Sequence, residues 1–124
     1  MALDLKKLKD ASSQVRLTVY YGDEELEFYA LLPTTEDRIQ YRREVAKCFN
    51  HRGKLDSEKL SRIQRRWAKR FLKGFREGDL VEDGKPLDPS DERWKEYLDE
   101  VAPEVLEGVT QRLFETDIEV SLRQ

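Results

Sequence analysis

The chain has 124 residues and a formal net charge of −3; 40% of its residues are charged and 38% are hydrophobic. A single cysteine, Cys48, excludes an internal disulfide and a cysteine-based metal cluster, and a single histidine, His51, excludes zinc sites that need two or more. No apolar run approaches the ~20 residues that cross a bilayer, and the N-terminus lacks the apolar core of a signal peptide, so we expect a cytoplasmic protein without membrane contact.

The first predicted element is an antiparallel β-hairpin. Apolar and polar residues alternate over residues 15–21 and again over 26–32, which is the period of a half-buried strand. A short turn at 22–23 joins the two runs, and Pro33 ends the second one. Because an isolated hairpin is only marginally stable in water, its apolar face needs helices to cover it.

Two helices are predicted to follow the hairpin. Thr34 or Thr35 can cap the first helix, which carries acidic residues in its first turn at the positive end of the helix dipole. Its apolar face is predicted to consist of Ile39, Val45, Ala46, Cys48 and Phe49. The second helix is predicted to start at a cap on Asp56 or Ser57 and to continue for about five turns as far as Gly78.

Two further helices are predicted after a turn-rich loop at residues 79–90. Asp88 followed by Pro89 is a good helix start, because proline suits the first helical position. The spacing i, i+3, i+4, i+7 then places one apolar stripe at Trp94, Tyr97, Leu98 and Val101. Pro103 either kinks this helix or starts a new one. The inward residues beyond it are predicted to be Val105, Leu106, Val109 and Leu113.

Together these elements predict a mainly helical α+β fold, with an N-terminal two-stranded antiparallel hairpin followed by about four helices. The chain has the length of one domain and contains no linker. We therefore expect a single domain over residues 1–124, with frayed ends at 1–12 and 116–124.

The helix predicted for residues 57–78 separates its aromatic rings from its cations. Advancing 100° per residue from Leu60 places Trp67, Phe71 and Phe75 within about 60° of the starting direction. The basic residues fall on the opposite side: Lys59, Arg62, Arg65, Arg66, Lys69, Arg70, Lys73 and Arg76. The rings are therefore predicted to be core anchors, which argues against a surface that stacks on nucleic-acid bases.

Two roles are open for this basic face. It can be a solvated surface that forms salt bridges with the acidic C-terminal part, each worth about 0–1 kcal/mol. It can also dock an acidic partner, because eight cations on one face repel one another. The candidate partner-binding residues are Arg62, Arg65, Arg66, Lys69, Arg70 and Lys73. A protein partner is favoured over nucleic acid, because residues 77–124 carry a net charge of −10, against +7 for residues 1–76, and would repel DNA.

No pattern in the sequence indicates catalysis or a bound cofactor. Cys48 and His51 lie three residues apart, but a buried thiol and a loop histidine are favoured over a nucleophilic pair. The acidic residues of the 91–100 segment are expected on the solvent side: Glu92, Glu96, Asp99 and Glu100. Since acid–base catalysis needs a shielded pocket, we expect a non-enzymatic protein with no catalytic residue, metal site or cofactor.

Two segments resemble the small tail assembly chaperones of long-tailed bacteriophages and prophages. One is "LLPTTEDRIQYRREVA", which follows an early strand pair, and the other is "DERWKEYLDEVAPEVLEGVTQRLFE". In the second segment the resemblance rests on Trp94, Tyr97, Leu98, Ala102, Pro103 and Leu106. It covers most of residues 15–115.

The resemblance implies a protein that coats the long, helical tape-measure protein in the bacterial host cytoplasm. Such a protein keeps the tape-measure protein soluble and helps to recruit tail-tube subunits. The opposite charges of the two halves could also drive head-to-tail self-association. Two alternatives stay open: a nucleic-acid-associated regulator that uses the basic helix at 59–76, and a structural head–tail connector subunit.

Overall fold

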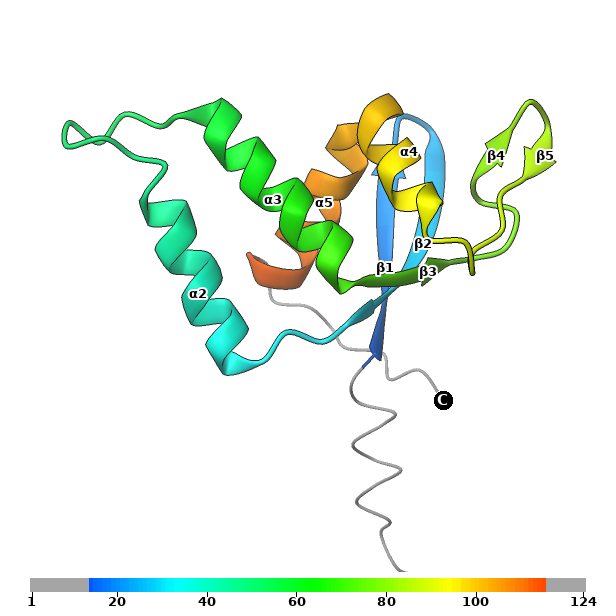
Figure 1. Ribbon diagram of the computed structural model, residues 1–124, viewed down its shortest axis with the longest axis horizontal. Helices are drawn as coiled ribbons and strands as arrows, with labels where there is room; N and C mark the ends of the chain where they lie inside the picture. The colour runs from blue at the N-terminus through cyan, green and yellow to red at the C-terminus, as the bar shows by residue number, and fades with distance from the viewer. Residues whose placement is uncertain (1–13, 116–124) are drawn as a thin grey trace, which may run out of the picture.

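The computed structural model describes residues 14–115. Its elements are β1 (Gln14–Tyr21), β2 (Glu24–Leu31), α2 (Thr35–Ala46), α3 (Ser57–Phe71), β3 (Leu72–Phe75), β4 (Val81–Glu82), β5 (Lys85–Pro86), α4 (Arg93–Val101) and α5 (Pro103–Phe114). The predicted α+β fold, with an N-terminal hairpin followed by four helices, is confirmed (Figure 1). Across residues 14–115, every helix is too short or too polar to cross a membrane. The predicted fraying of 1–12 and 116–124 lies outside the described residues.

The main sheet has three antiparallel strands in the order β1-β2-β3. The predicted alternation sets its register, in which Leu17 pairs with Phe28 and Val19 with Leu26. One face of the sheet is buried by Val15, Leu17, Val19, Leu26, Phe28 and Ala30. This face forms the floor of the core, and the helices cover it as the marginal stability of a lone hairpin requires.

The third strand corrects the predicted helix over 57–78. α3 ends at Phe71, and the chain continues directly as β3 with Leu72 in an extended conformation. Leu72 pairs with Ala30, and both residues are fully buried. An α3 that continued to Gly78 would leave the edge of β2 without hydrogen-bond partners, which costs more than the helical preference of four residues gains. Phe75 is consequently buried on the sheet and not on the helix.

The two C-terminal helices cover the sheet. Trp94 of α4 stacks on Phe28 with ring centroids 6.1 Å apart and meets the Phe75 ring edge-on at 4.9 Å. Gly108 lets α5 approach the sheet closely, since a Cβ atom there would lie 3.3 Å from Val19 Cγ1. The four residues predicted inward on α5 are all buried: Val105, Leu106, Val109 and Leu113.

The structure shows where the two C-terminal helices, α4 and α5, begin. Pro103 starts a new helix, because Ala102 departs from helical geometry with φ −142° and ψ 66°. The predicted helix start at Asp88–Pro89 is wrong, because α4 begins only at Arg93. Asp88 and Asp91 instead accept backbone hydrogen bonds from the residues two positions later, which forms turns in place of a helix.

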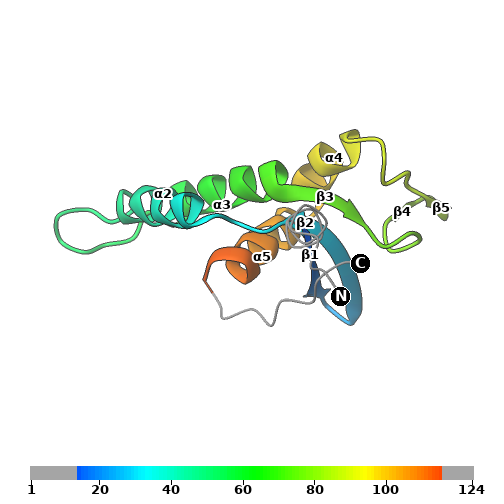
Figure 2. The ribbon, with the colours of Figure 1, turned by 90° about the horizontal axis from the view of Figure 1, so that it is seen from below.

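α2 packs on α3 and α5 and lies away from the sheet (Figures 1 and 2). Thr34 caps α2 in a capping box with Asp37. The predicted apolar face of α2 is confirmed only in part: Val45 packs against the core and Cys48 is buried, whereas Ile39, Ala46 and Phe49 are exposed. The buried side chain of the helix is Tyr41, which stacks on Phe114 at 4.6 Å, whereas Ile39 is 42% exposed. The helix ends at Ala46, so the buried Cys48 and the exposed Phe49 lie in the following loop.

Candidate protein-interaction site

The structure divides the six residues of the predicted basic face between two elements. Arg62, Arg65, Arg66, Lys69 and Arg70 lie on α3, as predicted, whereas Lys73 lies on β3. α3 has acidic side chains of α4 along one flank and acidic side chains of α2 along the other.

On the α4 flank, Asp99 binds two of the cations. Its carboxylate accepts 2.9 Å hydrogen bonds from both Arg65 and Lys69, and Lys69 lies 3.4 Å from Glu96. Asp99 was expected on the solvent side, but only 17% of its side chain is exposed. Burial favours a higher pKa for Asp99, but the hydrogen bonds from Lys69 and Arg65 hold the pKa below its usual value. The same hydrogen bond to Asp99 raises the pKa of Lys69.

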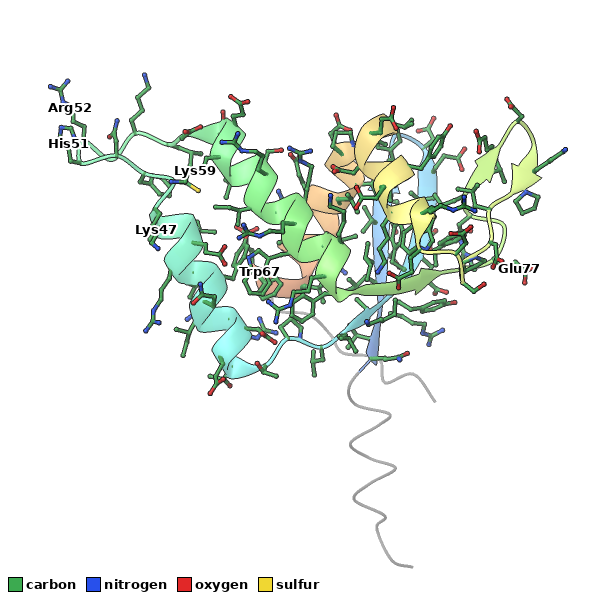
Figure 3. All side chains as sticks on the ribbon, viewed as in Figure 1. Lys47, His51, Arg52, Lys59, Trp67 and Glu77 are labelled. Atoms are coloured by element: carbon green, nitrogen blue, oxygen red, sulfur yellow. The ribbon has the colours of Figure 1, made fainter. Side chains whose placement is uncertain are left out.

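On the α2 flank, two further cations hold the helices together. Arg66 forms an ion pair with Glu44, whose second oxygen accepts a 3.0 Å hydrogen bond from the indole of Trp67. Arg70 lies 3.8 Å from Asp37, and its guanidinium lies 5.1 Å from the centre of the Trp67 ring. Trp67 therefore sits between α3 and α2 near the centre of the molecule (Figure 3).

Four of the six predicted residues are thus paired inside the protein. The salt-bridge interpretation describes Arg65 and Lys69, which pair with the acidic C-terminal part, while Arg66 and Arg70 pair with α2. Arg62 and Lys73 are exposed and form no ion pair within residues 14–115. They lie on different elements, so the basic side of α3 and β3 is not one continuous unpaired surface.

The Asp99 pairs make a pH-dependent contribution to stability that Asp99→Asn would remove. We expect the substitution to lower the free energy of unfolding by about 1 kcal/mol at pH 7, as for a partly exposed ion pair. Because the folded-state pKa of Asp99 is depressed, this contribution is present above a pH of about 4 and is lost as the pH falls through that pKa. Urea unfolding at pH 7 and near pH 2.5 measures it. A difference that persists at the lower pH, or an equal effect of the exposed Glu100→Gln, would contradict this assignment.

A second surface forms where the β4–β5 hairpin faces α4. Asp83 and Gly84, both with positive φ, make the tight turn that pairs Val81 with Pro86. The hairpin thereby brings apolar residues alongside α4 and leaves a groove of about 140 Å³ between them. The groove is lined by Leu80, Val81, Leu87, Trp94, Tyr97, Leu98 and Val101, and we call it the acidic groove for the rim described next.

The apolar floor of the acidic groove is open to solvent and carries a negative rim. Val81, Tyr97 and Val101 are 54%, 41% and 62% exposed. An adjoining open depression shares Leu87, Trp94 and Tyr97 with the floor. Its charged lining is net negative: Arg93 pairs with Asp91, and the other carboxylates are those of Glu82, Asp88, Glu96 and Glu100. The negative charge of Glu82 raises the pKa of Tyr97, which places that carboxylate beside the floor. Residues 77–101 as a whole carry ten acidic and three basic side chains.

This groove was not predicted from the sequence. The helical spacing predicts one apolar stripe of Trp94, Tyr97, Leu98 and Val101, but only Trp94 and Leu98 are buried in the core. The hairpin lies within the predicted loop at 79–90, although an Asp-Gly pair with apolar residues in the segments on both sides is the usual signal for a tight β-turn. An apolar stripe on α4 together with this signal would have indicated a second small layer beside the helix.

The acidic groove joins a small apolar floor to the adjoining open depression of about 550 Å³. Its apolar part is smaller than the roughly 300–1,000 Å³ of small-molecule sites. Cys48 is buried and donates to the carbonyl of Glu44 at 3.6 Å, and His51 is exposed in the α2–α3 loop. Within residues 14–115, no cluster of three or more His, Cys, Asp or Glu side chains could hold a metal ion. Comparisons with protein-family models, with curated proteins and with solved structures found no match.

Proposed function

We propose that this protein is a non-enzymatic tail assembly chaperone of a long-tailed phage or prophage that binds helical segments of the tape-measure protein in the host cytoplasm. The observation that carries the proposal is the acidic groove, which exposes a valine–tyrosine–valine floor beside a depression whose charged lining is net negative. A chaperone of this kind needs reversible contact with an amphipathic helix, and an apolar groove with a charged rim provides it.

The chemistry of the groove defines the client segment. Apolar side chains spaced i, i+3, i+4 along a client helix would cover Val81, Tyr97 and Val101. Lysine or arginine residues beside that stripe would face the rim carboxylates Glu82 and Glu100. We therefore expect the bound segment of the tape-measure protein to be an amphipathic helix with basic edges.

The test is co-expression with the tape-measure protein of the same genome. The double variant Tyr97→Ala/Val101→Ala is expected to weaken binding by about 10- to 100-fold, because it removes apolar surface worth roughly 1.5–3 kcal/mol. Soluble client recovered with the tagged protein should fall accordingly. The matched control, Tyr20→Ala/Ile39→Ala, removes the same kinds of exposed side chain elsewhere, at 69% and 42% exposure, and should leave recovery unchanged.

Nuclease treatment separates this proposal from the nucleic-acid alternative. Client recovery that survives nuclease, and that depends on Tyr97 and Val101, supports the chaperone. Recovery of nucleic acid alone, or equal loss in the groove and control variants, would overturn it. The alternative that uses the basic helix at 59–76 ranks second, because Arg65, Arg66, Lys69 and Arg70 are already paired within the protein.

A further inference from the structure

The α2–α3 loop and the first turn of α3 form a second interaction surface, which we call the basic tip (residues 47–59). It is held in one shape by internal hydrogen bonds. The side chain of Asn50 accepts 2.9 Å bonds from the backbone N–H groups of both Arg52 and Lys54, and its own N–H donates to the Lys54 carbonyl. A β-bridge joins Phe49 to Leu55 across the loop. The tip therefore projects from the helices with a backbone conformation that its own hydrogen bonds define.

The basic tip combines cations with exposed apolar side chains. Phe49 and Leu55 lie side by side and are 47% and 40% exposed. The surrounding cations are Lys47, Arg52, Lys54 and Lys59, and none of them forms an ion pair within residues 14–115. The tip also contains two acidic residues: Asp56, which caps α3 by accepting from the backbone N–H of Lys59, and Glu58. Four cations against two carboxylates leave it a net charge of +2. The tip is thus a positively charged, apolar-centred projection.

The basic tip and the acidic groove lie at opposite ends of the molecule. Figure 1 places the α2–α3 loop at one end of the longest axis and the β4–β5 hairpin at the other. In Figure 3 the side chains of His51 and Arg52 point outward from the tip, and Glu77 lies near the opposite end. One end of the molecule therefore carries a projecting basic loop with exposed apolar side chains. The other end carries a groove whose apolar floor lies beside acidic residues.

We propose that the basic tip of one molecule docks into the acidic groove of a second copy, so that the protein associates head to tail. In this contact Phe49 and Leu55 of one copy cover the exposed Tyr97 and Val101 of the next. Lys54 and its neighbouring cations face the rim carboxylates. The contact joins two different surfaces and is heterologous, so each added copy leaves a free tip and a free groove for the next.

The structure favours a second copy over a nucleic acid as the occupant. A nucleic acid would place its phosphates on the cations of the tip and could stack a base on Phe49, but it would leave Leu55 without an apolar partner. The groove provides both an apolar surface and a charge opposite to that of the tip. Each molecule carries one tip and one groove, so the two surfaces are always present in equal numbers. Two small patches make a weak, transient contact, and screening by salt should weaken it further.

Sedimentation equilibrium of the purified chain tests the proposal. At low salt the average mass of the wild type should rise with concentration above the monomer value of 14.7 kDa. It should return toward the monomer as salt is raised to about 0.5 M, where the screening length falls to a few ångströms. A wild type that stays monomeric at low salt, or an association that disappears on nuclease treatment, would overturn the proposal.

Two charge-reversal variants make the test specific. Arg52→Glu/Lys54→Glu gives an acidic tip. Glu82→Lys/Glu96→Lys/Glu100→Lys gives a basic groove, because four cations including Arg93 then face the two remaining carboxylates. All five substituted positions are exposed, so the fold should survive. Each variant alone should remain monomeric, because its tip and groove then carry like charges. An equimolar mixture should associate again, since acidic tips meet basic grooves and basic tips meet acidic grooves.

The control variant is Arg42→Glu/Lys73→Glu, which changes the net charge as the tip variant does but at exposed positions outside the tip. It should associate like the wild type. A mixture that stays monomeric, or a control that is impaired as much as the tip variant, would overturn the proposal. A client helix and the neighbouring tip would occupy the same groove, so that the client displaces the tip; this step rests on the proposed function. The mass measurements need no client, so a failure of self-association is distinguishable from a failure of client binding.

Discussion

Replacing Trp94 by alanine is expected to lower the free energy of unfolding by about 3–5 kcal/mol, the largest effect of any single substitution proposed for this protein. Trp94 is only 4% exposed and is the side chain through which α4 reaches the sheet, with ring contacts to Phe28 of β2 and Phe75 of β3. Its removal leaves a cavity at the junction of three elements. Urea unfolding followed by far-UV circular dichroism measures the loss.

Tyr97→Ala is the matched control for Trp94→Ala, because it removes an aromatic ring one turn further along the same helix. Tyr97 is 41% exposed, so its loss should cost well under half as much. Since Trp94 also lines the acidic groove, its alanine variant should lose client binding together with stability. Equal destabilisation by the two substitutions would show that α4 is not anchored through Trp94.

The second large effect is expected at Tyr41, and it should be local. α2 is anchored to the body by the Tyr41 ring, which stacks on Phe114 and meets Trp67 edge-on with centroids 6.0 Å apart. We expect Tyr41→Ala to cost about 2–4 kcal/mol and to let α2 open while the sheet and α5 stay folded. Hydrogen exchange should show lost protection for the amides of residues 38–47 and retained protection in β1 and β2.

Ile39→Ala is the control for Tyr41→Ala, because Ile39 belongs to the same helix but is 42% exposed. It should leave the exchange rates of α2 nearly unchanged. Burial also raises the pKa of Tyr41 to about 12, so the folded state holds a proton that an unfolded chain loses near pH 10. Stability should therefore fall between these two pH values in the wild type, and it should fall less steeply in Tyr41→Phe, where the raised pKa values of Lys69 and Tyr97 remain. A uniform loss of protection across the whole chain would contradict local opening.

The elements that the sequence predicted correctly are those whose periodicity decides their structure. The alternation in β1 and β2 fixes both the hairpin and its buried face, because a shift of one residue would turn every apolar side chain outward. The apolar spacing after Pro103 likewise predicts the buried face of α5, where one side of a regular helix meets the core. In both cases the local pattern and the tertiary packing favour the same arrangement.

The failures occur where tertiary contacts override the local pattern. Phe71 and Phe75 are spaced as on one helix, but Phe71 ends α3 and Phe75 belongs to β3. The change from helix to strand pairs the edge of β2, which would otherwise lack hydrogen-bond partners. Tyr41 lies in a polar run and shows no apolar periodicity; its burial depends on the rings of Phe114 and Trp67, which come from distant parts of the sequence. No local signal could have indicated it.

The candidate site divides in the same way. Periodicity placed the cations of α3 opposite its rings, and the structure keeps them there. It could not show that Asp99, Glu44 and Asp37 would be brought alongside them. The two parts of the acidic groove, a tight Asp-Gly turn and an apolar stripe on α4, are each visible in the sequence, but that they meet in one groove is a tertiary contact.

Because α3 passes directly into β3, the direction of the helix is set by the strand to which it is joined. No loop separates Phe71 from Leu72, and the 15 residues of α3 extend roughly 22 Å from the sheet at 1.5 Å per residue. The orientation of the α2–α3 loop is therefore fixed by the sheet through one continuous segment of backbone. Inserting a single residue in α3 would rotate that loop by about 100° about the helix axis. Lengthening the loop itself would change how far it projects from the helices and would leave its orientation about the α3 axis unchanged. These two properties can therefore change separately in evolution.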